Sequence, residues 1–238
     1  MSISRSVIHL YAAFDHVPGE LRLTGSAYVV GSALQLTSGA GHETGSCIVD
    51  IPIANIESKI VTIDFDVRIV CEHGCGDGLT VVLAPYQSIL LGVPGDVNTK
   101  CSSGLVCVQQ SEYGDYFSIS DGTSLVQNVG TPAIVDTFVG HMSVGLDAIG
   151  KRLYATLSGS GLSQPVHLMT PSSALSSLSS SQTYGIVIQG HSGAFSAIHT
   201  IDNLVVNITS SFPTSSPTIA PTSYPTIDSN APGMLYCN

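Results

Sequence analysis

The sequence predicts an all-β protein, an antiparallel two-sheet sandwich followed by an extended C-terminal tail. Three observations support this prediction. Many short apolar or alternating segments are separated by Gly- and Ser-rich turns, and no segment has the period of a persuasive amphipathic helix. Near the C-terminus, Pro-Thr recurs every four residues. We therefore place the sandwich at residues 1–209 and the tail at 210–238.

The clearest strand covers residues 59–70, KIVTIDFDVRIV, in which apolar side chains on one face alternate with polar ones on the other. The first residues, 1–14, lack a convincing signal peptide and are read as a first strand. Residues 171–181 are expected to form a helical turn or a loop. Further strands are expected, in order, at 19–30, 33–37, 78–84, 104–110, 116–121, 140–148, 151–159, 183–190 and 201–208.

Composition excludes two classes of partner. Only 10% of the 238 residues are charged, and the formal net charge is −10 with seven Lys and Arg. Nucleic acids and anionic membranes need a basic footprint that this chain lacks. No apolar run approaches the length of a transmembrane helix, so we expect no transmembrane segment.

Cysteine usage and a glycosylation motif indicate an oxidising compartment. Asn207-Ile208-Thr209 is an N-glycosylation sequon. We therefore expect a secreted protein, located outside the cell or at its surface. An even number of cysteines favours disulfides, and the candidates are Cys47, Cys71, Cys75, Cys101, Cys107 and Cys237.

The tail has the composition of a glycosylated rod. Proline excludes helix and central strand, which leaves extended polyproline II. At ~3.1 Å per residue, residues 213–228 span roughly 50 Å, enough to cross a compact domain about 43 Å wide. Cys237 lies beyond the rod, and its disulfide partner is expected either in its own domain or in another subunit. The expected O-glycosylation sites are Thr214, Thr218, Thr222 and Thr226.

Four stretches resemble, in order, the strands of the L-type (legume-like) lectins and the wider concanavalin A-like lectin/glucanase jelly roll. They are FDHVPGELRLTGSAYVVGSALQLTS, CGDGLTVVLAP, HMSVGLDAIGKRLYATL and YGIVIQGHSGAFSAIHTIDNLVVNI. The resemblance covers approximately residues 8–208. It implies a jelly-roll sandwich and a sugar site.

The resemblance places the sugar site at Asp77 and Gly78, with Gly193 and Ala194 in the loop GHSGAF. The Asp of the family's DGL motif accepts hydrogen bonds from a pair of sugar hydroxyls, as a carboxylate can. The alternative role for Asp77 is that of a turn residue between two glycines. The chain has no Trp to stack on a sugar, and Tyr113 and Tyr116 are the expected substitutes, although loop tyrosines more commonly cover a sandwich edge.

The metal ligands of the family are missing, so we expect no cofactor. Gln109 and Ser111 stand where the resemblance implies acidic ligands. Glu112, Asp115 and Asp121 offer an alternative calcium site, although such acids are more often solvated.

Zinc at Cys71, His73 and Cys75 is a second metal alternative. Structural zinc normally uses four ligands from paired motifs, and only one such motif is present. In an oxidising compartment these cysteines are therefore expected to form disulfides, either with one another or with other loops.

We expect no enzymatic activity. Asp64 and Asp66 have a spacing compatible with a glycosidase pair, but the hydrolase motif of the fold is absent and the two acids fit the solvent face of a strand. GHSGA is out of register for a nucleophile elbow.

The sequence thus leads to two functional hypotheses. The first is an extracellular structural glycoprotein that forms a homopolymer, in which the tail packs along the next copy and builds a filament. The second is a soluble or surface-tethered lectin that binds glycans at Asp77 without the usual metals.

Overall fold

A computed structural model describes residues 4–11, 14, 19–71, 75, 77–91, 106–111, 115–120, 125–134, 136–170, 175 and 178–211. The predicted tail glycosylation sites, Cys101 and Cys237 lie outside these residues. In the described parts, no helix is long and apolar enough to cross a membrane.

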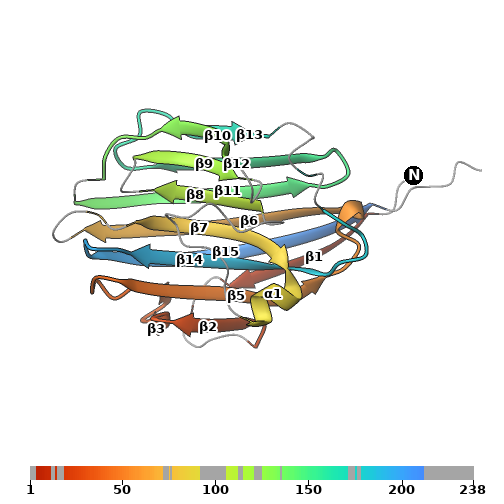
Figure 1. Cartoon of the computed structure of the whole chain (residues 1–238), viewed down its shortest axis with the longest axis horizontal. Coiled ribbons are helices and arrows are strands. Elements are labelled where there is room, and N and C mark those ends of the chain that lie inside the picture. Colours follow the sequence, from red (N-terminus) through yellow and green to blue (C-terminus); the bar gives the residue numbers. More distant parts are fainter. Residues whose placement is uncertain are drawn as a thin grey trace, which may run out of the picture.

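The described chain forms two antiparallel sheets packed face to face, as predicted (Figure 1). One sheet has eight strands in the order β13-β12-β11-β6-β15-β4-β3, with β1 also paired to β15. Its strands are β1 (Ser4–Tyr11), β3 (Tyr28–Val30), β4 (Ala33–Gln35), β6 (Lys59–Cys71), β11 (Thr137–Asp147), β12 (Arg152–Gly159), β13 (Val166–Met169) and β15 (Ala197–Ser211).

The other sheet has seven strands in the order β10-β9-β8-β7-β14-β5-β2. A 3-10 turn, η1 (Ile56–Ser58), leads from this sheet into β6, and the short helix α1 (Tyr86–Leu91) follows β7. The strands are β2 (Leu21–Gly25), β5 (Glu43–Ile53), β7 (Gly78–Pro85), β8 (Val106–Ser111), β9 (Tyr116–Ser120), β10 (Leu125–Gly130) and β14 (Tyr184–Ser192).

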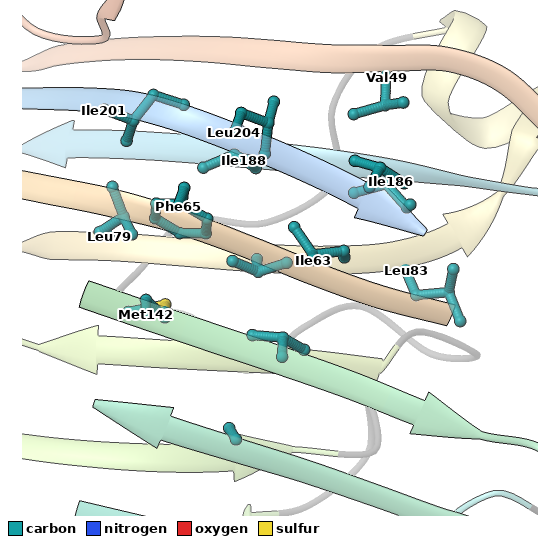
Figure 2. Close-up of a cluster of buried hydrophobic side chains, with 14 of the residues drawn as sticks. Val49, Ile63, Phe65, Leu79, Leu83, Met142, Ile186, Ile188, Ile201 and Leu204 are labelled. Carbon is teal, nitrogen blue, oxygen red and sulfur yellow. The ribbon is translucent and has the colours of Figure 1, made fainter. Parts of the chain in front are cut away.

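The core lies between the sheets, where both contribute alternate side chains. Figure 2 shows Phe65 and Met142 of the eight-stranded sheet together with Leu79 and Ile188 of the seven-stranded one. In β6 the predicted alternation is confirmed, because its apolar face is buried and its polar face is not.

Cys47 belongs to this core, and its expected disulfide is wrong. The residue is free and fully buried at the centre of β5. Burial raises the pKa of the thiol to about 12. By contrast, Cys71 and Cys75 are joined in a disulfide as expected, and that bond removes both thiolates from any zinc site.

The structure contains elements that the sequence did not predict, namely the strands β5, β10 and β13 and the helix α1. The alternation that marks β6 is absent in β5, because five consecutive residues, 45–49, are buried. The outer face of β5 is covered too: Ile48 packs in a second apolar cluster with Val82, Ala84, Val187 and Ile89, the last of these on α1. A strand buried on both faces has no period-2 signal.

Candidate functional site

Asp77 lies at the end of the sandwich where β7 begins. Its backbone N–H donates to the carbonyl oxygen of His191 at 3.2 Å, and the residue is only 8% exposed. The following residue has φ 118°, a conformation that favours glycine, which explains why Gly78 succeeds the acid. Strand β14 ends at this same end of the molecule, so its last residues reach Asp77 (Figure 1).

The loop after β14 packs directly on the Asp77 carboxylate. A Cβ on Gly193 would lie 2.5 Å from Oδ2 and 2.9 Å from Oδ1, so only glycine allows this approach. The carbonyl oxygen of Gly193 accepts the backbone N–H of His42 at 2.8 Å, which ties in the loop between β4 and β5. Ala194 follows on the exposed side. The structure therefore brings together the four predicted residues Asp77, Gly78, Gly193 and Ala194.

A hydrogen-bonded chain of three side chains holds the carboxylate. His191 Nε2 is 3.1 Å from Asp77 Oδ2, and His191 Nδ1 is 2.5 Å from the hydroxyl oxygen of Thr44. When the Thr44 hydroxyl donates to Nδ1, the proton of the neutral imidazole stands on Nε2 and points to Asp77. Both ends of the contact are shielded, since the side chains of His191 and Asp77 are 18% and 11% exposed.

This arrangement leaves one oxygen for a ligand. Oδ2 faces His191, whereas within the described part of the chain Asp77 Oδ1 has no hydrogen-bond donor. A carboxylate oxygen can accept two donors, so Oδ1 suits a pair of neighbouring hydroxyls.

Exposed residues form the rim of the site. Phe195 is 49% exposed and directly follows Ala194. Residues 40–42 on the opposite loop are exposed as well. An exposed aromatic side chain two residues after Gly193 offers a stacking surface in the same loop. Of the two predicted tyrosines, Tyr113 lies outside the described residues and Tyr116 is half-buried at the start of β9.

Sequence reasoning missed His191, Thr44 and Phe195 as site residues. The histidine and the phenylalanine flank Gly193, and their place in GHSGAF was the available signal. Thr44 gave none, because it lies 147 residues away from His191 in sequence, on a strand that was not predicted.

The strand on which the resemblance implies acidic metal ligands is β8, and it carries Gln109 and Ser111 at those positions. In β8, Ser111 pairs with Gly78 and Gln109 pairs with Thr80, so this strand runs beside the start of β7. Neither an amide nor a hydroxyl replaces the charge of a carboxylate for a hard cation. Among the described residues no three His, Cys, Asp or Glu side chains gather as a metal site. Asp115 precedes β9, and Glu112, Asp121 and His73 lie outside the described residues.

The two acids of β6 lie elsewhere, on the outer face of the eight-stranded sheet. His141 Nδ1 is 2.9 Å from Asp66 Oδ1, and Asn203 Nδ2 donates to Asp66 Oδ2 at 2.7 Å. Both hydrogen bonds lower the pKa of Asp66, and the one from Asn203 has the larger effect. The general acid of a glycosidase needs a raised pKa, so Asp66 does not fit that role.

Comparison with solved structures identifies the fold. The winged bean acidic lectin, complexed with methyl-α-D-galactose, superposes with a TM-score of 0.71 at 16% identity over 87% of this chain and 100% of its own. The fold is that of the legume lectins. Arcelin-5, a lectin-like defence protein from Phaseolus vulgaris, has a TM-score of 0.71 at 14% identity over 88% and 99% of the two chains. The lectin from Bauhinia forficata, in complex with GalNAc, has a TM-score of 0.69 at 15% identity over 87% and 99%.

Sequence comparison adds no closer relative. No family profile matches this chain, and no curated protein matches it either. The likeness at these identities establishes the fold, and the chemistry must be argued from the residues themselves.

Proposed function

We propose that this chain is a carbohydrate-binding protein whose site is centred on Asp77. The observation that carries the proposal is the carboxylate itself, buried at the sheet end, oriented by His191 through Oδ2 and left with Oδ1 for a ligand. A buried acid with one satisfied and one available oxygen is suited to hydroxyl pairs of a sugar. Hydrogen bonds to a charged group contribute more than neutral ones, which makes Asp77 the anchor.

The surrounding residues supply the rest of a sugar site. Gly193 brings backbone against the acid, and the exposed ring of Phe195 offers an apolar face to a pyranose. Galactose and N-acetylgalactosamine are the first ligands to test, since methyl-α-D-galactose and GalNAc are named in complexes of two lectins with this fold.

The test is titration calorimetry of the whole chain with galactosides, preceded by a broad glycan panel. Asp77→Asn keeps the shape of the side chain and removes its charge, so binding should weaken by at least about tenfold. Asp64→Asn is the matched control, because that acid lies on the outer face of the other sheet. A wild-type chain that binds no glycan, or an Asp77→Asn variant with unchanged affinity, would contradict the proposal.

Metal independence is part of the same proposal. Since the carboxylate is held by His191 and by packing against Gly193, EDTA should leave glycan affinity unchanged. Loss of binding in EDTA that returns with calcium would show that residues beyond those described complete a metal site.

Filament assembly remains a second proposal, based on the Pro-Thr repeat and on Cys237. Strand β15 extends to Ser211, so the truncation that tests it should remove residues 212–238 and keep the sheet intact. Filaments seen by electron microscopy of the full chain and lost in the truncated chain would support assembly. Filaments that persist after truncation would contradict it.

Both proposals, glycan binding and filament assembly, include secretion and N-glycosylation of the chain. The Cys71–Cys75 disulfide is compatible with an oxidising compartment. Asn207 lies on β15 opposite Thr62 of β6 and is half-buried, on the outer side of the eight-stranded sheet. A glycan there would cover the middle of that sheet face.

A further inference from the structure

Asn207 has the geometry of a glycan acceptor on the outer face of the eight-stranded sheet. Its neighbour Val206 points into the core and is 0% exposed, so the Asn207 side chain points away from the core. The Thr209 hydroxyl donates to Asn207 Oδ1 at 3.4 Å, which joins the two side chains of the sequon. Within the described part of the chain, Asn207 Nδ2 has no hydrogen-bond partner and is not shielded from solvent. The nitrogen that carries an N-linked glycan is therefore accessible.

Asn207 and Asp77 lie toward opposite ends of the sandwich. Asn207 pairs with Thr62 near the start of β6, and β6 runs on to Cys71, roughly 30 Å away at the rise of a strand. The disulfide between Cys71 and Cys75 then leads to Asp77, at the end of the sandwich where β7 begins (Figure 1).

The two positions also belong to opposite faces. Residues four apart in a strand share a face, so His191 lies on the same side of β14 as Val187, which packs in the apolar cluster outside the seven-stranded sheet. His191 contacts Asp77 from this side, whereas Asn207 points outward from the other sheet.

This placement determines the kind of contact that two copies can make through a sugar. An isologous pair presents the same patch of both copies, and that patch would have to contain Asn207 and Asp77 together. Because these residues lie on opposite faces, a glycan on one copy and the site of another meet in a heterologous contact. Such a contact leaves a free site at one end and a free glycan at the other, so further copies can add.

We infer that the Asp77 site of one copy binds the N-linked glycan on Asn207 of another copy. The inference rests on the proposed function and names its ligand, a sugar of an N-linked oligosaccharide with neighbouring hydroxyls. Each copy carries a formal net charge of −10, so close approach of two protein surfaces is unfavourable. A glycan bridge keeps those surfaces apart. It also joins copies without the Pro-Thr tail, which distinguishes it from assembly through residues 212–238.

The test uses two variants of the full chain with its native glycans, each of which lacks one half of the contact. Asn207→Gln keeps the site and loses the glycan, whereas Asp77→Asn keeps the glycan and loses the charge of the site. In sedimentation velocity, each variant alone should associate at least about tenfold more weakly than the wild-type chain. A mixture of the two variants should form heteromeric complexes that do not grow further, because the site and the glycan at their ends are missing.

The sequon provides a matched control. Thr209→Ser keeps the sequon and should associate like the wild-type chain, whereas Thr209→Ala removes it and should behave like Asn207→Gln. Intact mass spectrometry shows which variants carry the glycan, and unfolding midpoints show that they are folded. Trimming the glycan of the folded wild-type chain with an endoglycosidase should reduce association without any substitution.

The N-linked glycan released from the chain is the monovalent probe. It should bind the wild-type chain in titration calorimetry and compete with self-association. A wild-type chain without a glycan on Asn207, or association that persists in Asn207→Gln and Thr209→Ala, would overturn the inference and leave the sugar site standing. The same conclusion would follow if the chain bound other glycans but not the released one. Failure of every glycan to bind would overturn the proposed function together with the inference.

Discussion

Two buried threonines provide a stringent test of the polar interior. Thr37 and Thr80 are 0% and 4% exposed, and Thr→Val is the same chemical change at both positions. The Thr37 hydroxyl is fully used: it donates to Ala197 O at 2.6 Å and accepts the His199 backbone N–H at 3.0 Å. It also accepts from His199 Nδ1 at 2.7 Å when the proton stands on that nitrogen. Within the described part of the chain, the Thr80 hydroxyl is buried without a hydrogen-bond partner.

The expected effects therefore have opposite tendencies. Thr37→Val removes three hydrogen bonds at about 1 kcal/mol each and leaves buried partners unpaired, so the free energy of unfolding should fall by about 3 kcal/mol or more. Thr80→Val removes only a desolvated hydroxyl from a β-strand, so stability should stay unchanged or rise by about 1 kcal/mol. The two variants should differ by about 4 kcal/mol.

Urea unfolding of the full chain measures this difference, provided that the m-values of the variants agree. For a chain of this size the gap corresponds to about 8–16 °C in melting temperature. Equal destabilisation by both substitutions would refute the reasoning, because it would mean that threonine burial rather than hydrogen bonding decides the cost. Thr37 and His199 also anchor the loop at 38–42, so Thr37→Val should weaken glycan binding as well.

Three further outcomes are expected. Cys47 should resist alkylation at pH 8 in the native chain and react after unfolding, as peptide mass spectrometry can show, because burial raises the pKa of its thiol to about 12. For the same reason, as the pH rises above about 8.5, wild-type stability should fall more steeply than that of Cys47→Ala. Asn203→Gly keeps the φ of 50° and removes the donor, so the NMR-measured pKa of Asp66 should rise toward its ordinary value of 3.8. The lowered pKa of Asp66 adds stability above pH 3.8 that is lost as the pH falls through its native pKa, and Asn203→Gly should lose part of that contribution. Gly193→Ala should abolish glycan binding by pressing on Asp77, whereas Gly19→Ala, which has open space around its Cβ, should have no effect.

Alternation between buried and exposed side chains made β6 the clearest strand in the sequence, whereas β7 and β14, which are buried along nearly their whole length, were predicted as short apolar runs. In β6 the outer side chains of Asp64 and Asp66 are partly exposed while Phe65 between them is fully buried, so alternation is visible in the residues. The strand β5 shows no alternation because Ile48 on its outer face is buried in an apolar cluster with Ile89 of α1 and side chains of β7 and β14. The helix α1 has six residues, too few to display a helical period.

The residues of the candidate site also fall into two groups, those with a local signal in the sequence and those without one. Asp77 and Gly193 stand in motifs that a resemblance can transfer, and each has a local backbone reason for its identity. The contacts of His191 with Asp77 and Thr44 join three strands that are distant in sequence, and no local pattern encodes such a meeting. The sequence therefore names Asp77 as the candidate sugar ligand and does not reveal the groups that surround its carboxylate.

The groups around Asp77 are relevant to the question of how a sugar site could work without the metal ligands of the family. A sugar-binding carboxylate must be fixed before the ligand arrives, because a mobile side chain would lose conformational entropy on binding. A bound cation is one means of fixing nearby loops, and Gln109 and Ser111 do not provide for it. In this chain the His191 imidazole lies 3.1 Å from one carboxylate oxygen and within hydrogen-bond distance of the Thr44 hydroxyl, and Gly193 closes the space beside Asp77. The sandwich itself thus preorganises Asp77, which makes a metal-free sugar site physically consistent with the fold.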